Sequence, residues 1–138
     1  MIGIDTNVLV RYVVQDDAEQ CLAVNELFGS ASAKNKLFVS TVVVVESIWV
    51  LTRRYHATNE QIMYLLRFLL ESKKVSLERP EVFATLITHD DLKSKEIADA
   101  IIASIAFDAG CKEFFTFDAK LKRLVELYHN ADPESRSG

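Results

Sequence analysis

The first nine residues, Met1-Ile2-Gly3-Ile4-Asp5-Thr6-Asn7-Val8-Leu9, decide the class of fold. The apolar run of residues 1–4 is typical of a buried strand, and the three polar residues after it are all good helix caps. Val8 and Leu9 then begin an apolar stripe with helical spacing. A strand that passes directly into a helix, repeated along a chain, predicts a parallel sheet covered by helices on both faces.

The remaining sequence continues this alternation. We expect further strands at 75–77 and 114–117, and helices at 16–32, 58–72, 80–89, 95–109 and 119–128, with Ser94 as a cap and Gly110 as a terminator. Residues 37–45 are ambiguous. Periodicity alone favours one β-branched strand, whereas the alternative is a strand at 37–39 followed by a helix capped by Ser40 or Thr41.

Length and composition indicate one globular domain. The chain has 138 residues, of which 49% are hydrophobic and 26% charged, which excludes a disordered or fibrous protein. We expect a domain at 1–130 and a polar tail at 131–138. A net charge of −4 argues against a basic nucleic-acid coat protein but not against a nucleic-acid enzyme, which needs acids to hold metal. The sequence has two cysteines without the spacing of metal ligands, no long apolar run and no export signal. These features predict a cytoplasmic protein without a membrane span.

Four acids are candidates for a functional site. Asp5 and Asp118 each follow a predicted strand, so a parallel sheet would bring them to one edge, unless both only cap helices. Glu46 and Asp99 interrupt apolar stretches. The alternative for both is a first-turn acid that the helix dipole favours, or a half-exposed acid at the edge of the apolar stripe. Four converging carboxylates repel one another, so at least one should have a raised pKa. An all-oxygen donor set without His or Cys favours Mg²⁺ or Mn²⁺.

Four segments together resemble a known family. Residues 2–9, the stretch 43–51 around Glu46, the stretch 97–103 around Asp99, and Gly110-Cys111 followed by 115–118 are similar, in order, to the acidic motifs of PIN-domain nucleases. The resemblance covers residues 1 to about 124. It implies a three-layer α/β/α sandwich with a central parallel sheet of four to five strands, and it places Glu46 on a helix with the strand at 37–39.

The resemblance also implies an activity and partners. It implies an endoribonuclease that uses Mg²⁺ or Mn²⁺, with Asp5, Glu46, Asp99 and Asp118 as catalytic metal ligands. Small single-domain members are typically VapC-type toxins, which a VapB-type antitoxin inhibits and which often form homodimers. The sequence departs from the family pattern at Glu96, where a further Asp is common, and at residues 125–129, which are a poor candidate for the usual fifth strand.

Other residues are predicted to support this site. Thr6, Asn7 and Thr116 lie beside the acids and either assist a metal or cap helices. Arg11, Lys120 and Arg123 either form a basic rim for RNA phosphates or lie on solvated helix faces. A haloacid-dehalogenase-type phosphatase is disfavoured because Asn7 stands where its second Asp is needed. The remaining alternative is a non-catalytic PIN-like scaffold that binds RNA or protein.

Overall fold

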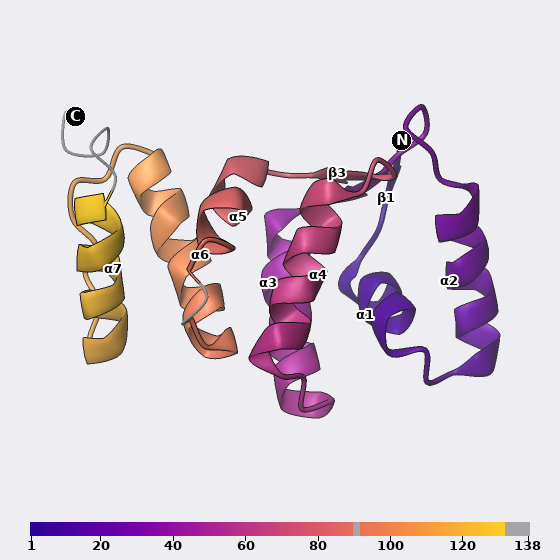
Figure 1. Cartoon of the computed structure of the whole chain (residues 1–138), viewed down its shortest axis with the longest axis horizontal. Coiled ribbons are helices and arrows are strands. Elements are labelled where there is room, and N and C mark those ends of the chain that lie inside the picture. Colours follow the sequence, from indigo (N-terminus) through magenta and orange to yellow (C-terminus); the bar gives the residue numbers. More distant parts are fainter. Residues whose placement is uncertain (90–91, 132–138) are drawn as a thin grey trace.

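A computed structural model describes residues 1–89 and 92–131 of the chain (Figure 1). Seven helices and three strands occur in this part of the chain, and the strands are short. In order they are β1 (Ile2–Gly3), α1 (Thr6–Val14), α2 (Ala18–Ser30), β2 (Leu37–Val39), α3 (Thr41–Arg54), α4 (Asn59–Glu71), β3 (Val75–Leu77), α5 (Pro80–Leu86), α6 (Ser94–Asp108) and α7 (Ala119–Ala131).

The strands form one parallel sheet in the order β1-β2-β3. Ile2 pairs with Leu37, and Leu37 pairs in turn with Val75. The predicted α/β class with a parallel sheet is therefore confirmed. The sheet has three strands in the described residues, fewer than the four to five expected, because residues 114–117 form no strand there. The first strand also differs from expectation, since Ile2 is 45% exposed and only Ile4 of this run is buried.

The alternative strand-then-helix interpretation of residues 37–45 is correct. β2 ends at Val39, and the Ser40 side chain accepts a hydrogen bond of 3.2 Å from the Val43 N–H, which caps α3. Every third or fourth residue of α3 is then buried, including Val44, Ile48 and Leu51. Periodicity alone failed here because a run of valines fits a strand and a buried helix equally well.

The helices follow the predicted order with small shifts at their ends. Lys93, rather than Ser94, occupies the N-cap position of α6, because the Ser94 N–H and hydroxyl both donate to Asn59 Oδ1 of α4, at 2.9 and 2.8 Å. Gly110 follows α6 with φ +105°, as expected of a helix terminator. α7 continues to Ala131, so residues 125–129 are helical, and the predicted tail beyond Ala131 lies outside the described residues.

The core joins the sheet to the helices in one cluster. Its largest fully buried side chains come from several elements, among them Leu9, Leu37, Ile48, Leu66, Phe83 and Ile101. α3 packs against both α1 and α6, and α6 packs against α5 and α7. The result is an elongated arrangement in which α6 and α7 lie at one end and β1, α1 and α2 towards the other (Figure 1). No helix in the described ranges is long and apolar enough to cross a membrane.

Candidate active site

The carboxyl edge of the sheet carries Asp5 and Glu78. Asp5 follows β1, is exposed, and its Oδ1 accepts a hydrogen bond of 3.0 Å from the Val8 N–H, so it caps α1. Glu78 follows β3, and its Oε1 accepts a hydrogen bond of 2.9 Å from the Thr41 N–H at the start of α3. This bond lowers the pKa of Glu78. The prediction that Asp5 follows the first strand and begins a helix is thus confirmed.

Glu46 lies on α3, as the resemblance implied, and its side chain is exposed. The next two residues, Ser47 and Ile48, are almost completely buried. α3 has its start fixed by Ser40 and by Glu78 and packs between α1 and α6. The helix that carries Glu46 is therefore held between the helix that Asp5 caps and the helix that contains Asp99.

Burial and the negative charge of Asp118 both act on the carboxyl group of Asp99. Asp99 is half-buried on α6, and burial raises its pKa, with a further increase from the negative charge of Asp118. Lys95 opposes this rise, and Glu96 adds to it. The expectation that at least one acid has a raised pKa is therefore met, although burial contributes more than like-charge repulsion. The half-exposed position of Asp99 also matches the alternative interpretation that it is a half-exposed acid without a metal-binding role.

Asp118 is held in place by its own backbone surroundings. Its Oδ1 accepts hydrogen bonds from the Lys120 and Leu121 N–H groups, at 2.9 and 3.2 Å, so it caps α7. These two bonds, Leu121 first, lower the pKa of Asp118. Thr116 Oγ1 accepts a hydrogen bond of 3.0 Å from the Asp118 N–H. Thr116 therefore fixes the backbone at Asp118 through the peptide N–H and not through the carboxylate, and its support of a metal site stays a prediction.

The structure brings together some, but not all, of the predicted acids. In residues 1–89 and 92–131 there is no group of three or more His, Cys, Asp or Glu side chains placed to hold a metal ion. The negative charge of Asp118 raises the pKa of Asp99, whereas neither Asp5 nor Glu46 is among the groups that shift the pKa of Asp99 or of Asp118. Asp118 does not reach the sheet edge through a strand, because the segment before it is unpaired.

The comparison with family models identifies this fold. The model of the PIN domain matches residues 2–127, nearly the whole chain. The chain belongs to the PIN-domain family. PIN domains are generally nucleases that act on nucleic acids, and they typically use divalent metal ions. No curated protein and no solved structure gave a match to this PIN domain.

The remaining predicted residues of the PIN domain fall into two groups. Thr6 is buried in the first turn of α1, and Asn7 beside it is exposed. Of the basic residues, Arg11 forms an ion pair with Asp16, whose other oxygen accepts a hydrogen bond from the Tyr55 hydroxyl. Lys120 and Arg123 are exposed on α7.

Glu96 helps to cap a helix in this PIN domain. Its Oε2 accepts a hydrogen bond of 3.0 Å from the Lys93 N–H, so it helps to cap α6. The bond occupies one carboxylate oxygen of Glu96, the residue at which the sequence departs from the family pattern. Glu96 still contributes negative charge near Asp99, whose pKa it raises.

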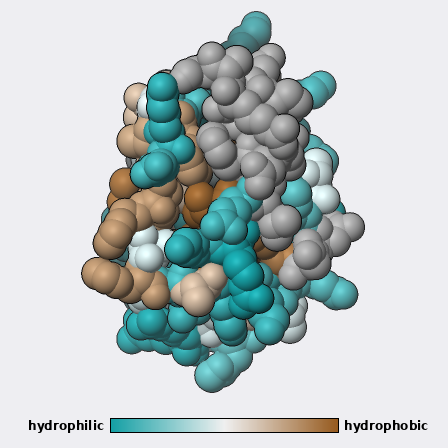
Figure 2. All heavy atoms as spheres, turned by 90° about the vertical axis from the view of Figure 1, so that its left-hand side faces the viewer, coloured by the Kyte–Doolittle hydropathy of each residue, from teal (hydrophilic) through white to brown (hydrophobic). Residues whose placement is uncertain are grey.

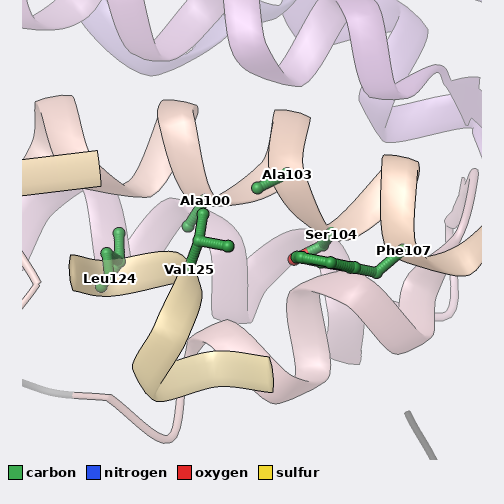
Figure 3. A pocket seen from close by; sticks show the side chains of 6 residues that line it. All are labelled: Ala100, Ala103, Ser104, Phe107, Leu124 and Val125. Carbon is green, nitrogen blue, oxygen red and sulfur yellow. The ribbon is translucent and has the colours of Figure 1, made fainter. Parts of the chain in front are cut away.

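None of the four predicted acids lines either of two hollows on the described residues. The first is a crevice of about 10 Å³ between α6 and α7, lined by Ala100, Ala103, Ser104, Phe107, Leu124 and Val125 (Figure 3). It is too small for a substrate and marks imperfect packing of α7 on α6. The second is a groove of about 800 Å³ between α1, α3 and α4, whose lining includes Tyr12, Tyr64 and Phe68. The sequence pattern does not reveal this groove, because its residues follow ordinary core spacing.

Proposed function

We propose that this PIN domain is an endoribonuclease that depends on Mg²⁺ or Mn²⁺. The observation that carries the proposal is that this chain is a PIN domain in which the half-buried Asp99 of α6 has its pKa raised by burial and by the negative charge of Asp118, which comes from a separate element. A half-buried carboxylate beside a second carboxylate is costly without a counter-charge. A divalent cation supplies that counter-charge more completely than Lys95 alone.

The donor chemistry of the site fits a hard cation. Asp5, Glu46, Asp99 and Asp118 would hold the ion, and all four offer carboxylate oxygens only. The capping bonds of Asp5 and Asp118 go to Oδ1 in each case, which leaves Oδ2 outside these bonds. When bound, such an ion lowers the pKa of a water nucleophile and stabilises charge on the phosphate.

The chain's own residues position these ligands and the RNA. Thr116 holds the Asp118 peptide, and Thr6 and Asn7 flank Asp5. Lys120 and Arg123 on α7 supply positive charge beside Asp118, where an RNA phosphate would bind. Arg11, the third predicted cation, is engaged with Asp16 and would have to leave this pair to contact RNA.

We further propose that the nuclease is the toxin of a type II toxin–antitoxin pair, which a VapB-type antitoxin inhibits, and that it acts in the cytoplasm. The match of the PIN-domain model to residues 2–127 supports this proposal. Co-expression with the product of a short reading frame directly upstream, followed by co-purification and loss of RNA cleavage, tests it. Full cleavage activity in the presence of that product would contradict it.

Cleavage of total RNA in EDTA, Mg²⁺ or Mn²⁺ tests the nuclease. Asp5→Asn should abolish metal-dependent cleavage and leave the fold intact, because Asn caps a helix as well as Asp does. Asp17→Asn is the matched control, since Asp17 caps α2 through a 2.9 Å bond from the Gln20 N–H but is outside the proposed site. Equal cleavage by both variants, or undiminished cleavage in EDTA, would refute the assignment.

A non-catalytic scaffold is the second candidate function. It is favoured by one observation: the described part of the chain holds no group of three potential metal ligands. A scaffold would bind RNA without cutting it, and the affinity would be the same in EDTA and in Mn²⁺. Binding that ignores the metal, together with absent cleavage, would establish this alternative.

A further inference from the structure

One side of α3 carries four exposed side chains in a single stripe. They are Val42, Glu46, Trp49 and Arg53, and we call them the α3 stripe. At about 100° per residue, their spacing places them within about 60° of one another around the helix axis. Trp49 is 44% exposed, although tryptophan is buried for the most part on average, and it lies outside the core cluster of the described residues.

Arg53 stacks on Trp49 within this stripe. Its guanidinium carbon lies 3.8 Å from the centroid of the indole ring, which is the geometry of a cation–π contact. The contact orders both side chains before any ligand is present. A further flat group that joins the stack therefore costs less conformational entropy than it would on two free side chains.

The second half of α3 is positively charged, although the whole chain has a net charge of −4. After Glu46 this helix contains no further acid, and its last turn has Arg53 and Arg54, which are both exposed. Cations at the end of a helix also complement its dipole, but that role needs no exposed tryptophan beneath them. A ligand that offers both negative charge and flat aromatic groups matches the two properties together, and single-stranded nucleic acid is such a ligand.

The stacked pair lies close to a proposed metal ligand. Trp49 and Arg53 follow Glu46 on the same side of α3, about 4.5 and 10.5 Å further along the helix axis. Successive phosphates of a stacked strand are about 3.4 Å apart along its axis, so these distances correspond to roughly one to three nucleotides. A base held at Trp49 would therefore belong to a nucleotide near the phosphate that the acids would bind.

The proposed acids also have cations on their other side. α6, which contains Asp99, packs against both α3 and α7 and lies between them (Figure 1). Hydrophilic side chains cover much of the end of the molecule at which α7 lies (Figure 2), and Lys120 and Arg123 are exposed on this helix. RNA phosphates at α7 and a base at α3 would thus place the strand across α6.

We propose that Trp49 and Arg53 form a subsite that holds an unpaired base of the RNA substrate next to the cleaved phosphate. The base extends the stack of the two side chains, and Arg53 and Arg54 attract the phosphate beside it. Every base has a flat face, so this subsite selects single-stranded over duplex RNA rather than one particular base. Its place in a nuclease rests on the proposed function, whereas the stacking requires only that the chain bind RNA.

Tryptophan fluorescence reports on this subsite directly, because Trp49 is the only tryptophan in the sequence. Titration of the full chain in EDTA with a short single-stranded RNA should quench the emission, since a stacked base deactivates the excited indole. An abasic strand with the same number of phosphates should leave the emission nearly unchanged, and a duplex of the same sequence should quench it weakly. No quenching by the single strand, or equal quenching by all three nucleic acids, would overturn the proposal.

Substitutions separate the ring from the charge. Trp49→Leu should raise the KM for RNA cleavage about fivefold to a hundredfold and change kcat by less than about twofold, because the ring contacts a base and not the reacting atoms. Trp49→Phe keeps a stacking face and should recover most of this loss. Arg53→Lys should also raise KM, since it keeps the charge but loses the flat guanidinium. Tyr64→Leu is the matched control, because Tyr64 is an aromatic residue of α4 that is 75% exposed, and its KM should be unchanged.

The two experiments distinguish failure of the subsite from failure of the nuclease. A wild type that cleaves RNA with the same KM as Trp49→Leu would overturn the subsite and leave the nuclease standing. A wild type that does not cleave RNA, but whose emission only single strands quench, would refute the nuclease and retain the subsite as a binding site. Emission that shifts with protein concentration and is not quenched by RNA would mean that a second copy covers Trp49, which would overturn the proposal.

Discussion

Glu78 connects the end of β3 to the start of α3, and its removal should measurably loosen the helix that carries Glu46. The carboxylate accepts one hydrogen bond of 2.9 Å from the Thr41 N–H and lies near the positive end of the helix dipole. A helix cap of this type contributes about 0.5–2 kcal/mol, and the exposure of Glu78 places the value towards the lower half of this range. We therefore expect Glu78→Ala to lower the free energy of unfolding by about 1 kcal/mol. Glu78→Gln, which retains an acceptor, should lose about half as much.

Thermal unfolding at several pH values tests this expectation. A loss of 1 kcal/mol corresponds to a decrease in Tm of roughly 3–5 °C for a chain of this size. The pKa of Glu78 is lowered by the Thr41 bond, so the stabilisation is present above the unfolded-state pKa and disappears as pH falls through the folded-state pKa. The difference between wild type and Glu78→Gln should thus be full at pH 7 and should disappear in acid, as pH falls from the usual glutamate range through the lower folded-state pKa. Glu26→Ala, an exposed position on α2, is the control. An equal Tm for Glu78→Ala and Glu26→Ala, or a difference independent of pH, would refute the reasoning.

Three further predictions concern the C-terminal half of the chain. Asp99→Asn should raise Tm near neutral pH. The folded-state pKa of Asp99 is raised, so the stability that this residue contributes is lost as pH rises through that value. A pH profile of unfolding that the substitution leaves unchanged would contradict this. For a site with a Kd of about 100 µM, 10 mM Mn²⁺ should add about 2.7 kcal/mol to the free energy of unfolding. Tm measurements should show this gain in wild type and should show none in Asp118→Asn or with EDTA. Val125→Ala should lower the free energy of unfolding by about 1.5 kcal/mol in a denaturant titration, because Val125 is 8% exposed at the contact of α7 with α6. A negligible decrease would mean that α7 does not pack on α6 there.

Local sequence signals predicted the elements whose ends are set by nearby residues. Thr58 caps α4 by accepting a 3.2 Å bond from the Gln61 N–H, three residues away, and the sequence places this helix within one residue at each end. The strand at 75–77 was likewise predicted with its observed bounds. The cap of α4 lies within three positions of the chain, whereas β3 also needs its pairing with β2, and there the short apolar run alone matched the observed bounds.

Elements that depend on distant partners were predicted less well. Ser94 was expected to cap α6, but its hydroxyl bonds to Asn59, which is 35 positions earlier. Residues 114–117 have strand propensity, yet a strand exists only when another strand supplies hydrogen bonds, and this segment has no such partner in the described chain. Of the candidate site, the raised pKa expected for at least one acid is found at Asp99, where burial is the larger cause and Asp118 the next. Convergence with Asp5 and Glu46 stays a prediction.

Direct titration of Mn²⁺ into the protein tests the central claim that these four acids form one metal centre. Binding followed by calorimetry should be tight in wild type, and Asp5→Asn, Glu46→Gln, Asp99→Asn and Asp118→Asn should each weaken it by at least about tenfold, because affinity depends on the number of charged ligands. Asp17→Asn should bind as wild type does. Mn²⁺ affinity that is the same in all five variants, or no binding by a wild type that still cleaves RNA, would contradict the account.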